Sequence, residues 1–582
     1  MKMWASQRVR SAPLLALALL GWSAAQASNL EITIDGLKDE LEHAARANLT
    51  LEQYRDRDAS EAQIRRLFAG AEREISAALE PYGYYNSQVT SELRTTEKGF
   101  DAVFHVTLGP PTLVVEQNVV VSGDAANLPP VKQAVRRFEP RKGQRLDHGE
   151  YEASKEAVET ALQSVGYLRM QATTHRVEVT RRTHTARIDV EWESGPRLRF
   201  GPVHFSKSQF PPGFLDRFIP WKEGDYFSQD QVLALQQRLA NADYFATIST
   251  LPDLSNKDSL DVPIRVEVTP AKPTIYTASV YITTDTGFGV QIGKEKRWIN
   301  SAGHKAGVDI DWAQRRQIAS AHYLIPLPGP HDRSFNFGIS YKNEDTNTSH
   351  SRNTRVSANE LRQWHGYTRT LGFVSLAGTF EIAEEQNYSK LFYAEGSLTR
   401  KKADDLSFPR NGYSLAYVLR AGPEKLLSDT SFVQVFADGK YIRPLGSRQR
   451  LILRGTLGTL TASDFDELPP ELRFFAGGDR SIRGFDYQQI GSTNSAGEVI
   501  GGTHLAVASV EVERYFVPKW GMALFVDGGD AFRTERFRWN VGAGLGVRWR
   551  SPIGVVRVDV AKPVVSDLAD KIRYHIAIGP DL

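Results

Sequence analysis

The 582-residue chain contains no cysteine, and its 71 basic and 69 acidic side chains nearly cancel, leaving a formal charge of +2. Without cysteine the chain can form neither a disulfide framework nor a thiolate metal site. The charge balance lacks the basic excess that is typical of proteins that bind nucleic acid. Because so long a chain exceeds one compact core, several domains are expected.

Long hydrophobic runs are also missing beyond the first residues of the chain. There, three basic residues precede an apolar stretch at 12–22 and an A-x-A pattern at 25–27. This combination is typical of a secretory signal peptide over 1–27, and the stretch is shorter than the roughly 20 residues of a spanning helix. An exported chain of this kind is either soluble or a β-barrel, because only helices and closed barrels satisfy every backbone polar group in lipid.

Residues 29–273 carry a repeat with a spacing of about 80 residues. In each copy a helical pattern stops and an aromatic residue begins a strand; the equivalent segments are 78–85, 161–168 and 239–245. Gly83 and Gly166 suit the left-handed residue at a helix end, and Asp243 takes that place in the third copy. The expected order in each copy is strand, helix, helix, strand, strand. The spacing by itself also fits unrelated α+β repeats of a binding protein.

From residue 274 onward the chain changes to alternating segments of about ten residues, the length of a tilted transmembrane strand. In segment 335–341 large apolar side chains share one face and small polar ones the other, and segments 413–420 and 572–578 repeat this. A soluble sandwich shows the same alternation, but the export signal and aromatic residues near strand ends favour a membrane barrel. These residues are Tyr276, Tyr281, Tyr341, Tyr413 and Tyr574. The remaining length allows about sixteen strands, within a range of roughly fourteen to eighteen.

A glycine-rich turn in this half of the chain carries the most specific motif. The motif residues are Ile482, Arg483, Gly484 and Phe485. A buried Arg483 needs carboxylate partners, because an unpaired charge away from water costs several kcal/mol. Glu511 and Asp527 lie on nearby strand-like segments and have the required charge. An ordinary surface turn with an exposed arginine is the alternative interpretation.

These patterns resemble the Omp85 family of outer-membrane assembly and translocation proteins. The matching segments, in chain order, are the turn 408–413, the motif at 477–485, the strands 508–515 and 525–529, and the closing strands 544–548 and 552–559. The resemblance implies three α+β POTRA domains followed by a transmembrane antiparallel barrel of about 16 strands. It also implies that the loop with Arg483 folds back into the lumen, where Glu511 and Asp527 receive the guanidinium.

The resemblance also suggests a domain division and a branch of the family. The expected division is a signal peptide at 1–27, POTRA 1 at 28–110, POTRA 2 at 111–195, POTRA 3 at 196–273 and the barrel at 274–582. Three POTRA domains and the ending 578–582 are most similar to the TamA branch, the outer-membrane subunits of translocation and assembly modules. This branch implies a non-enzymatic role in inserting or secreting outer-membrane proteins such as autotransporters, with phospholipid transport as a further role.

The same branch implies partners and a location. An inner-membrane-anchored TamB-like protein is expected to bind POTRA 1, and outer-membrane lipids and client proteins to contact the barrel. The expected location is the bacterial outer membrane, with the POTRA domains in the periplasm. No catalytic residue, cofactor, metal or nucleic acid is expected.

The mechanism expected from the sequence is lateral opening where the first and last barrel strands meet, because two loosely paired edges can template an incoming strand. The seam is expected between 276–282 and 572–578. Its residues are Tyr276, Val280, Ile282, Ile572, Tyr574 and Ile576. The alternatives are a two-partner-secretion transporter or another Omp85 channel, and a passive channel or uptake receptor. An outer-membrane hydrolase is disfavoured because neither a G-x-S-x-G nor an H-E-x-x-H motif occurs.

Overall fold

The computed structural model describes residues 29–579 except 56, 58, 98, 328–332, 406–407, 426, 534–535, 552–553 and 569–570. The predicted signal peptide at 1–27 and the ending 580–582 lie outside the described residues. The chain forms two compact units: the first holds the described residues up to Arg199 with Gly224–Gln229 and Lys257–Asp261, and the second holds the remainder. None of the described helices is long and apolar enough to cross a membrane.

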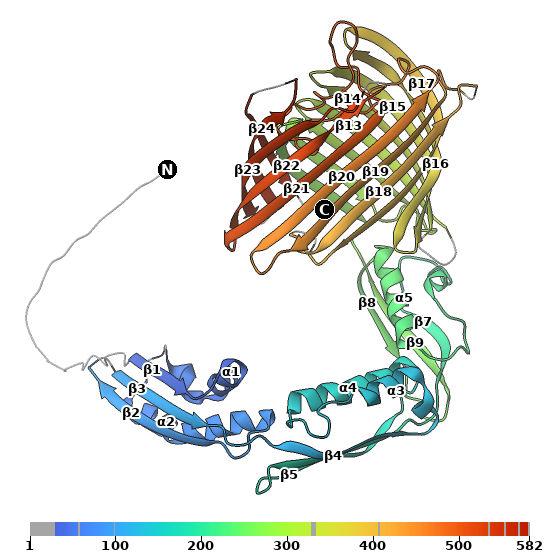
Figure 1. Ribbon diagram of the computed structural model, residues 1–582. Coiled ribbons are helices and arrows are strands. Elements are labelled where there is room, and N and C mark those ends of the chain that lie inside the picture. The colour runs from blue at the N-terminus through green and yellow to red at the C-terminus, as the bar shows by residue number, and fades with distance from the viewer. Residues whose placement is uncertain are drawn as a thin grey trace, which may run out of the picture. The chain divides into compact units, whose positions relative to one another are not determined.

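Two α+β modules make up most of the first unit (Figure 1). The first contains β1 (Asn29–Asp35), α1 (Asp39–Asn48), η1 (Thr50–Tyr54), α2 (Glu61–Leu79), η2 (Glu80–Tyr82), β2 (Gln88–Thr96) and β3 (Gly99–Thr107). The second contains β4 (Leu113–Ser122), η3 (Asp124–Asn127), α3 (Pro129–Arg136), α4 (His148–Ser164), β5 (Gln171–Thr180) and β6 (Thr185–Glu193). Their sheets have the orders β1-β3-β2 and β4-β6-β5, with the outer strands parallel and antiparallel to the central one. Both modules therefore show the predicted order of elements.

A left-handed residue ends the long helical segment in each module, as the repeat predicts. Gly83 has φ of +82°, Gly166 has +99°, and Asp243 in the third module has +57°. In the first module the Tyr84 amide donates to the Leu79 carbonyl at 3.2 Å, a bond that satisfies an otherwise free carbonyl at the helix end. The turn directs the following chain into a strand.

The third module departs from the predicted order. It contains β7 (Arg199–Phe205), η4 (Leu215–Phe218), α5 (Gln229–Asn241), β8 (Phe245–Pro252) and β9 (Asp261–Pro270), in a sheet of order β7-β9-β8. The predicted first helix is wrong here, because a short 3-10 turn stands in its place. Pro211, Pro212 and Pro220 flank that turn. Proline removes a backbone donor and crowds the preceding turn, so a regular α-helix cannot extend through this segment.

Sixteen strands, β10 to β25, pair in sequence order and close into an antiparallel barrel (Figure 1). They are β10 (Thr274–Thr283), β11 (Gly287–Lys296), β12 (Lys305–Ala313), β13 (Arg316–Pro326), β14 (Ser334–Asp345), β15 (Ser349–Trp364), β16 (Tyr367–Ile382), β17 (Glu385–Ala403), β18 (Gly412–Gly422), β19 (Phe432–Pro444), β20 (Gln449–Ala462), β21 (His504–Val517), β22 (Trp520–Phe532), β23 (Asn540–Ser551), β24 (Gly554–Val565) and β25 (Arg573–Gly579). The predicted barrel of about sixteen strands is confirmed.

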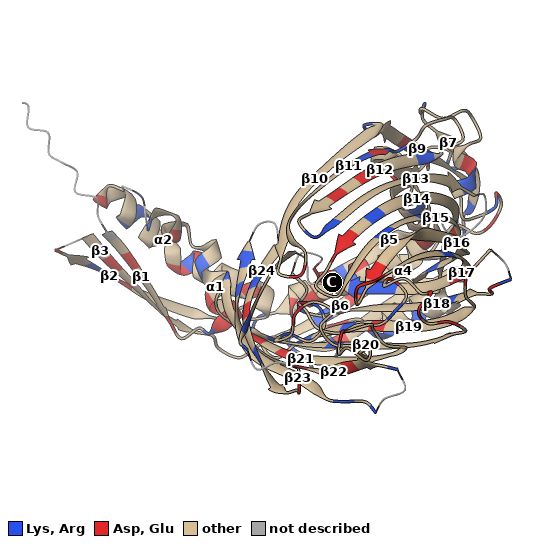
Figure 2. Cartoon of the chain, turned by 90° about the horizontal axis from the view of Figure 1, so that it is seen from above, with Lys and Arg blue, Asp and Glu red and all other residues tan. Residues whose placement is uncertain are grey.

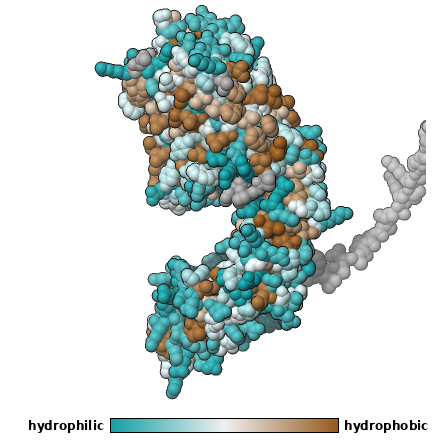
Figure 3. Space-filling model, turned by 90° about the vertical axis from the view of Figure 1, so that its right-hand side faces the viewer, coloured by the Kyte–Doolittle hydropathy of each residue, from teal (hydrophilic) through white to brown (hydrophobic). Residues whose placement is uncertain are grey.

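The two faces of the barrel wall differ in chemistry, as expected where lipid lies outside and an aqueous lumen inside. On β12, Val308, Ile310 and Trp312 are half exposed on the outer face, and acidic residues alternate with them. Figure 3 shows hydrophobic side chains around the middle of the outer surface, and Figure 2 shows charged residues interspersed along the strands. Tyr281 was among the aromatic residues predicted to lie at the membrane interface, but it faces the lumen. Its hydroxyl donates to Asp311 on the inner side of the wall.

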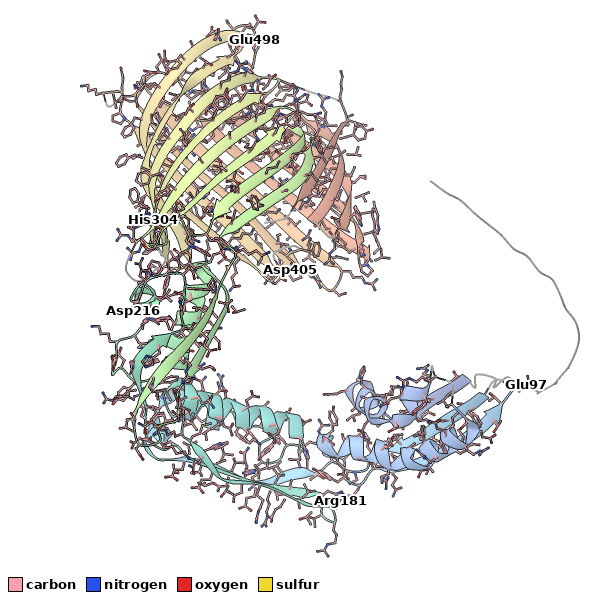
Figure 4. The ribbon with its side chains drawn as sticks, turned by 180° about the vertical axis from the view of Figure 1, so that it is seen from behind. Glu97, Arg181, Asp216, His304, Asp405 and Glu498 are labelled. Atoms are coloured by element: carbon pink, nitrogen blue, oxygen red, sulfur yellow. The ribbon has the colours of Figure 1, made fainter. Side chains whose placement is uncertain are left out.

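The third module is joined to the neighbouring end of the barrel by an aromatic contact. The Tyr244 hydroxyl donates to the Gly303 carbonyl in the β11–β12 turn at 2.6 Å, and the rings of Phe210 and Phe214 pack against Tyr244. Burial raises the pKa of Tyr244 to about 12, so the phenol remains a donor at neutral pH. Figure 4 shows Asp216 and His304 at this end of the barrel and Glu498 at the opposite end. The turns from odd-numbered to even-numbered strands thus lie at the end of the barrel next to the third module.

We expect Gly83→Ala to destabilise the first unit more than Gly143→Ala does. Both glycines have positive φ, so alanine at either position costs roughly 1–2 kcal/mol of backbone strain. A Cβ at Gly83 would also lie 2.4 Å from the Leu146 carbonyl oxygen, whereas a Cβ at Gly143 meets nothing within 4 Å. Proteolysis of the full-length protein in rising urea, scored by loss of the fragment 29–195, measures the difference. Equal midpoints for the two variants would show that the carbonyl does not restrict position 83.

Candidate functional site

The connection between β20 and β21, residues 463–503, fills part of the barrel interior. Its apolar side chains pack against inward-facing residues of the wall in one cluster. From the connection the cluster contains Phe465, Leu468, Leu472, Phe474, Ala476, Ile482, Phe485 and Ile490. By its place in the strand order this connection would project outside the cell, yet Ile482 and Phe485 have no exposed surface. We call residues 463–503 the lumen loop.

Arg483 lies midway along the lumen loop and contacts three strands of the wall. Its Nε and Nη2 atoms donate to the two carboxylate oxygens of Asp527 on β22 at 2.7 and 3.0 Å. Its Nη1 atom donates to Glu511 on β21 at 2.8 Å and to Asp559 on β24 at 2.9 Å. The backbone amide of Arg483 also donates to Asp527 at 3.0 Å. Such bidentate, charge-assisted geometry is available to arginine and not to lysine.

A second arginine completes the ion cluster from within the wall. Arg548 on β23 has no exposed surface and contacts Glu511 at 2.7 Å, Glu513 at 2.9 Å and Asp559. Glu511 and Asp559 therefore each bridge Arg483 of the loop to Arg548 of the wall. Because every carboxylate faces at least one guanidinium, the buried charges compensate each other.

Close backbone approach lets Arg483 reach this position. The neighbouring Gly484 has φ of +100°. On β23, a Cβ at Gly542 would lie 1.8 Å from the Arg483 carbonyl oxygen, so only glycine fits there. The guanidinium also lies over the Phe525 ring at 3.4 Å from the centroid, which adds a cation–π contact.

The first and last barrel strands meet in a short seam. Among the described residues, β10 and β25 share one register pair, Thr283 with Ala577, whereas β24 and β25 pair continuously from Val555 to Ala561. Two further hydrogen bonds join Thr284 to Ile576, at 3.2 and 2.8 Å. These contacts lie at the C-terminal end of β10 and in the C-terminal half of β25.

The predicted seam residues lie beside this short contact. Tyr276, Val280 and Ile282 are exposed on the outer face of β10, Tyr574 and Ile576 belong to β25, and Ile572 precedes β25. Of these six, Ile576 is joined to Thr284 across the seam by the two hydrogen bonds. Among the described residues, none of the other five is a register partner there.

The lumen loop contacts both sides of the seam through Asp479. One carboxylate oxygen accepts from the Thr284 amide after β10 at 3.0 Å, and the other accepts from Nδ1 of His575 on β25 at 2.7 Å. The Gly484 amide donates to Nε2 of His575 at 2.9 Å, so Nε2 is unprotonated and Nδ1 carries the proton. The amide of Asp479 donates to Asp285 in the β10–β11 turn at 3.1 Å. Burial, with a smaller contribution from the Asp479 carboxylate, raises the pKa of Asp285 to about 7.

Several contacting residues were not identified from the sequence. Arg548 and Asp559 lie in segments that matched the family, but their mutual approach depends on strand register. Glu513 could have been found, since it lies two residues from Glu511 and so shares its face. His575 and Asp479 carried no local signal. In the described part of the chain, no three His, Asp or Glu side chains lie where they could hold a metal ion.

These features define a class of protein: a transmembrane barrel with periplasmic α+β modules and a loop held in its lumen by a buried arginine. Residues 244–579 match the profile of the Omp85 superfamily domain. The chain belongs to the Omp85 superfamily. Residues 31–108 match the profile described as POTRA domain TamA domain 1, and residues 198–271 match the surface antigen variable number repeat, a POTRA profile. The protein is located in the bacterial outer membrane, with its POTRA domains in the periplasm.

Curated relatives and solved structures show the same similarity. Over 364 residues the chain is 24% identical to outer membrane protein assembly factor BamA of Nitratidesulfovibrio vulgaris, covering 59% of this chain and 45% of the relative. Over 194 residues it is 28% identical to BamA of Neorickettsia risticii, covering 30% of this chain and 25% of the relative. The chain thus spans less than half the length of either relative. A crystal structure of Haemophilus ducreyi BamA lacking POTRA domains 1–3 has a TM-score of 0.65 at 17% identity, covering 80% of this chain and 99% of that one, and shows the fold.

We expect Arg483→Ala to destabilise the folded barrel by about 3–5 kcal/mol, because it leaves buried carboxylates without their counterion. Arg483→Lys should fall between the wild type and alanine, since lysine keeps the charge and loses the bidentate fork. The temperature at which unheated samples lose folded mobility in SDS gels gives the order of stabilities.

Arg480→Ala is the matched control for this experiment. Arg480 lies three residues away in the same lumen loop and is exposed. A melting temperature for Arg483→Ala equal to that of Arg480→Ala would show that the ion cluster does not hold the loop.

Proposed function

We propose that this protein is the outer-membrane subunit of a translocation and assembly module. In this role it assists the insertion or secretion of outer-membrane proteins such as autotransporters, and it does so without enzymatic chemistry. The observation that carries the proposal is the match of residues 31–108 to a first POTRA domain of TamA type. Among the described residues three such modules precede the barrel, in keeping with the same branch.

We also propose a partner and a division of labour. POTRA 1, at 28–110, binds an inner-membrane-anchored TamB-like protein, while POTRA 2 at 111–195 and POTRA 3 at 196–273 connect that contact to the barrel at 274–582. The first module offers exposed sheet edges at β1 and β2, since both are outer strands of its sheet. Unpaired strand edges can add a strand from a partner. Transport of phospholipid is the further role proposed for the same assembly.

In the proposed mechanism the barrel opens at the seam between β10 and β25. Closing a barrel removes its sheet edges, and a seam with one register pair can release both edges at low cost. An incoming client strand then pairs with an exposed edge through backbone hydrogen bonds. The ion cluster of Arg483, Glu511 and Asp527 serves as the latch that keeps the lumen loop in place, and Asp479 links that loop to the seam.

Locking the seam with a disulfide tests this mechanism. Because the native chain has no cysteine, Thr283→Cys with Ala577→Cys creates a single thiol pair across the one register pair. Oxidation should abolish assembly of an autotransporter client in reconstituted membranes, and reductant should restore it. The yield of folded, protease-protected client is the measurement.

A cysteine pair inside the wall controls for oxidation itself. Ala437 and Leu457 are register partners on β19 and β20, away from the seam, and Leu457 is exposed to lipid. Their cross-link should leave client assembly unchanged. Full assembly with the seam locked would rule out lateral opening.

Removal of the first module distinguishes an assembly factor from a passive channel. We expect deletion of 29–110 to leave barrel insertion intact while client assembly falls to background and the TamB-like partner no longer co-purifies after cross-linking. If the protein is instead a passive channel, conductance should be high in the intact protein, and removal of the module should leave it unchanged. Unchanged client assembly in the deletion variant would contradict the proposed role.

A further inference from the structure

A cavity of about 440 Å³ opens at the periplasmic rim of the barrel, apart from the lumen loop and the seam. Its walls come from the turns that join β17 to β18, β19 to β20 and β21 to β22, and from the end of β23. Lining residues include Phe408, Arg410, Arg448, Arg450, Tyr515 and Arg550. Four of these are arginines, and none of the described lining residues is acidic.

The positive charge of this rim cavity is largely uncompensated. Arg450 is buried and paired with Glu513 at 2.6 Å, so it contributes little net charge. Among the described residues, no carboxylate forms an ion pair with Arg410, Arg448 or Arg550. The nearby Asp404 accepts from the backbone amides of Arg410 and Asn411 and does not line the cavity. Three guanidinium groups therefore favour an anion within one small volume.

The cavity is held in shape before any ligand binds. The Phe408 ring contacts two guanidiniums, with Arg450 at 4.0 Å and Arg550 at 3.7 Å from its centroid. Arg410 and Arg550 also donate to the carbonyls of Gly446 and Pro518 in neighbouring turns, at 2.7 and 3.3 Å. These bonds connect separate periplasmic turns, so Arg410, Arg450, Arg550 and the aromatic floor are held in one arrangement. A preformed site loses less entropy on binding.

The outer edge of the cavity is continuous with the lipid-facing surface. Phe516 and Val517 line it and are each 52% exposed, beside Trp520 and Trp549, whose rings stack at 5.8 Å on the outer face. Aromatic residues gather at the level of the lipid head groups, with the apolar ring towards the chains. A ligand here can place an anionic group on the arginines and an acyl chain along Phe516 and Val517.

We propose that this rim cavity is a binding site for the head group of an anionic phospholipid from the periplasmic leaflet. The phosphodiester lies against Arg410, Arg448 and Arg550, Phe408 and Tyr515 form the floor, and the acyl chains remain in the bilayer. The site depends on the location of the barrel in the outer membrane and not on the protein-assembly role. An acidic client peptide would satisfy the arginines but makes no use of the lipid-facing edge.

Titration of the detergent-solubilised full-length protein with a short-chain phosphatidylglycerol tests the site. Native mass spectrometry should show one tightly retained lipid per chain. Arg448→Gln should weaken binding by about tenfold or more, because one charge-assisted contact to the phosphate is lost. Arg448 is exposed, so the substitution leaves the fold intact, and the SDS gel assay verifies this for each variant.

Arg443→Gln is the matched control, since Arg443 is exposed on the same rim at the end of β19 but does not line the cavity. Its binding of phosphatidylglycerol should equal that of the wild type. Equal losses in the two variants would overturn the proposal by showing non-specific attraction to a basic rim.

Three other ligands distinguish the possible sources of the anion. Short-chain phosphatidylcholine should bind more weakly than phosphatidylglycerol, and glycerol phosphate without acyl chains should bind more weakly still. Equal affinity for glycerol phosphate would contradict a lipid site, because the lipid-facing edge would then contribute nothing. Tighter binding of an acidic peptide than of the lipid, lost in Arg448→Gln, would assign the cavity to a polypeptide and overturn the proposal.

Discussion

The compensation of one buried charge is the constraint on which the interior of this barrel depends. Arg483 is 3% exposed, and a guanidinium so far from water requires carboxylates in fixed places. Asp527, Glu511 and Asp559 supply them from β22, β21 and β24. The loop can therefore occupy the lumen only in the position where one side chain contacts three strands, and this requirement determines the path of residues 463–503.

Such a cluster holds the loop in a single geometry and adds less to the stability of the barrel. Replacing a buried ion pair by apolar groups of similar volume is often neutral or stabilising, so burial alone does not explain the arginine. An apolar loop packed against an apolar wall could slide, whereas a bidentate contact to Asp527 has one orientation. The apolar cluster around Phe485 packs the loop against the wall, and Arg483 sets the position of the loop along it.

The sequence predicted the barrel and the core of the site, and it failed where contacts depend on long-range pairing. The alternation with period two is visible in the sequence because one face of every strand contacts lipid and is apolar. The motif around Arg483 pointed to Glu511 and Asp527 as its partners. Asp559 is 76 residues from Arg483, and which carboxylate faces the guanidinium is set by the register of β23 and β24. The absence of a first helix in the third module could have been predicted from the sequence, because Pro211, Pro212 and Pro220 lie in that segment.

The seam and the lumen loop are physically dependent on each other. Strands that share one register pair gain little from their own ladder, so the contacts that bridge them from elsewhere carry more weight. Asp479 bridges Thr284 and His575, and it lies four residues from Arg483 in the same loop. Displacing Arg483 from its carboxylates would move Asp479 with it and remove the bridge. In the proposed gate the two requirements are separate: the edge strands stay loosely paired, and closure is provided by a loop whose Arg483 is paired with carboxylates on β21, β22 and β24.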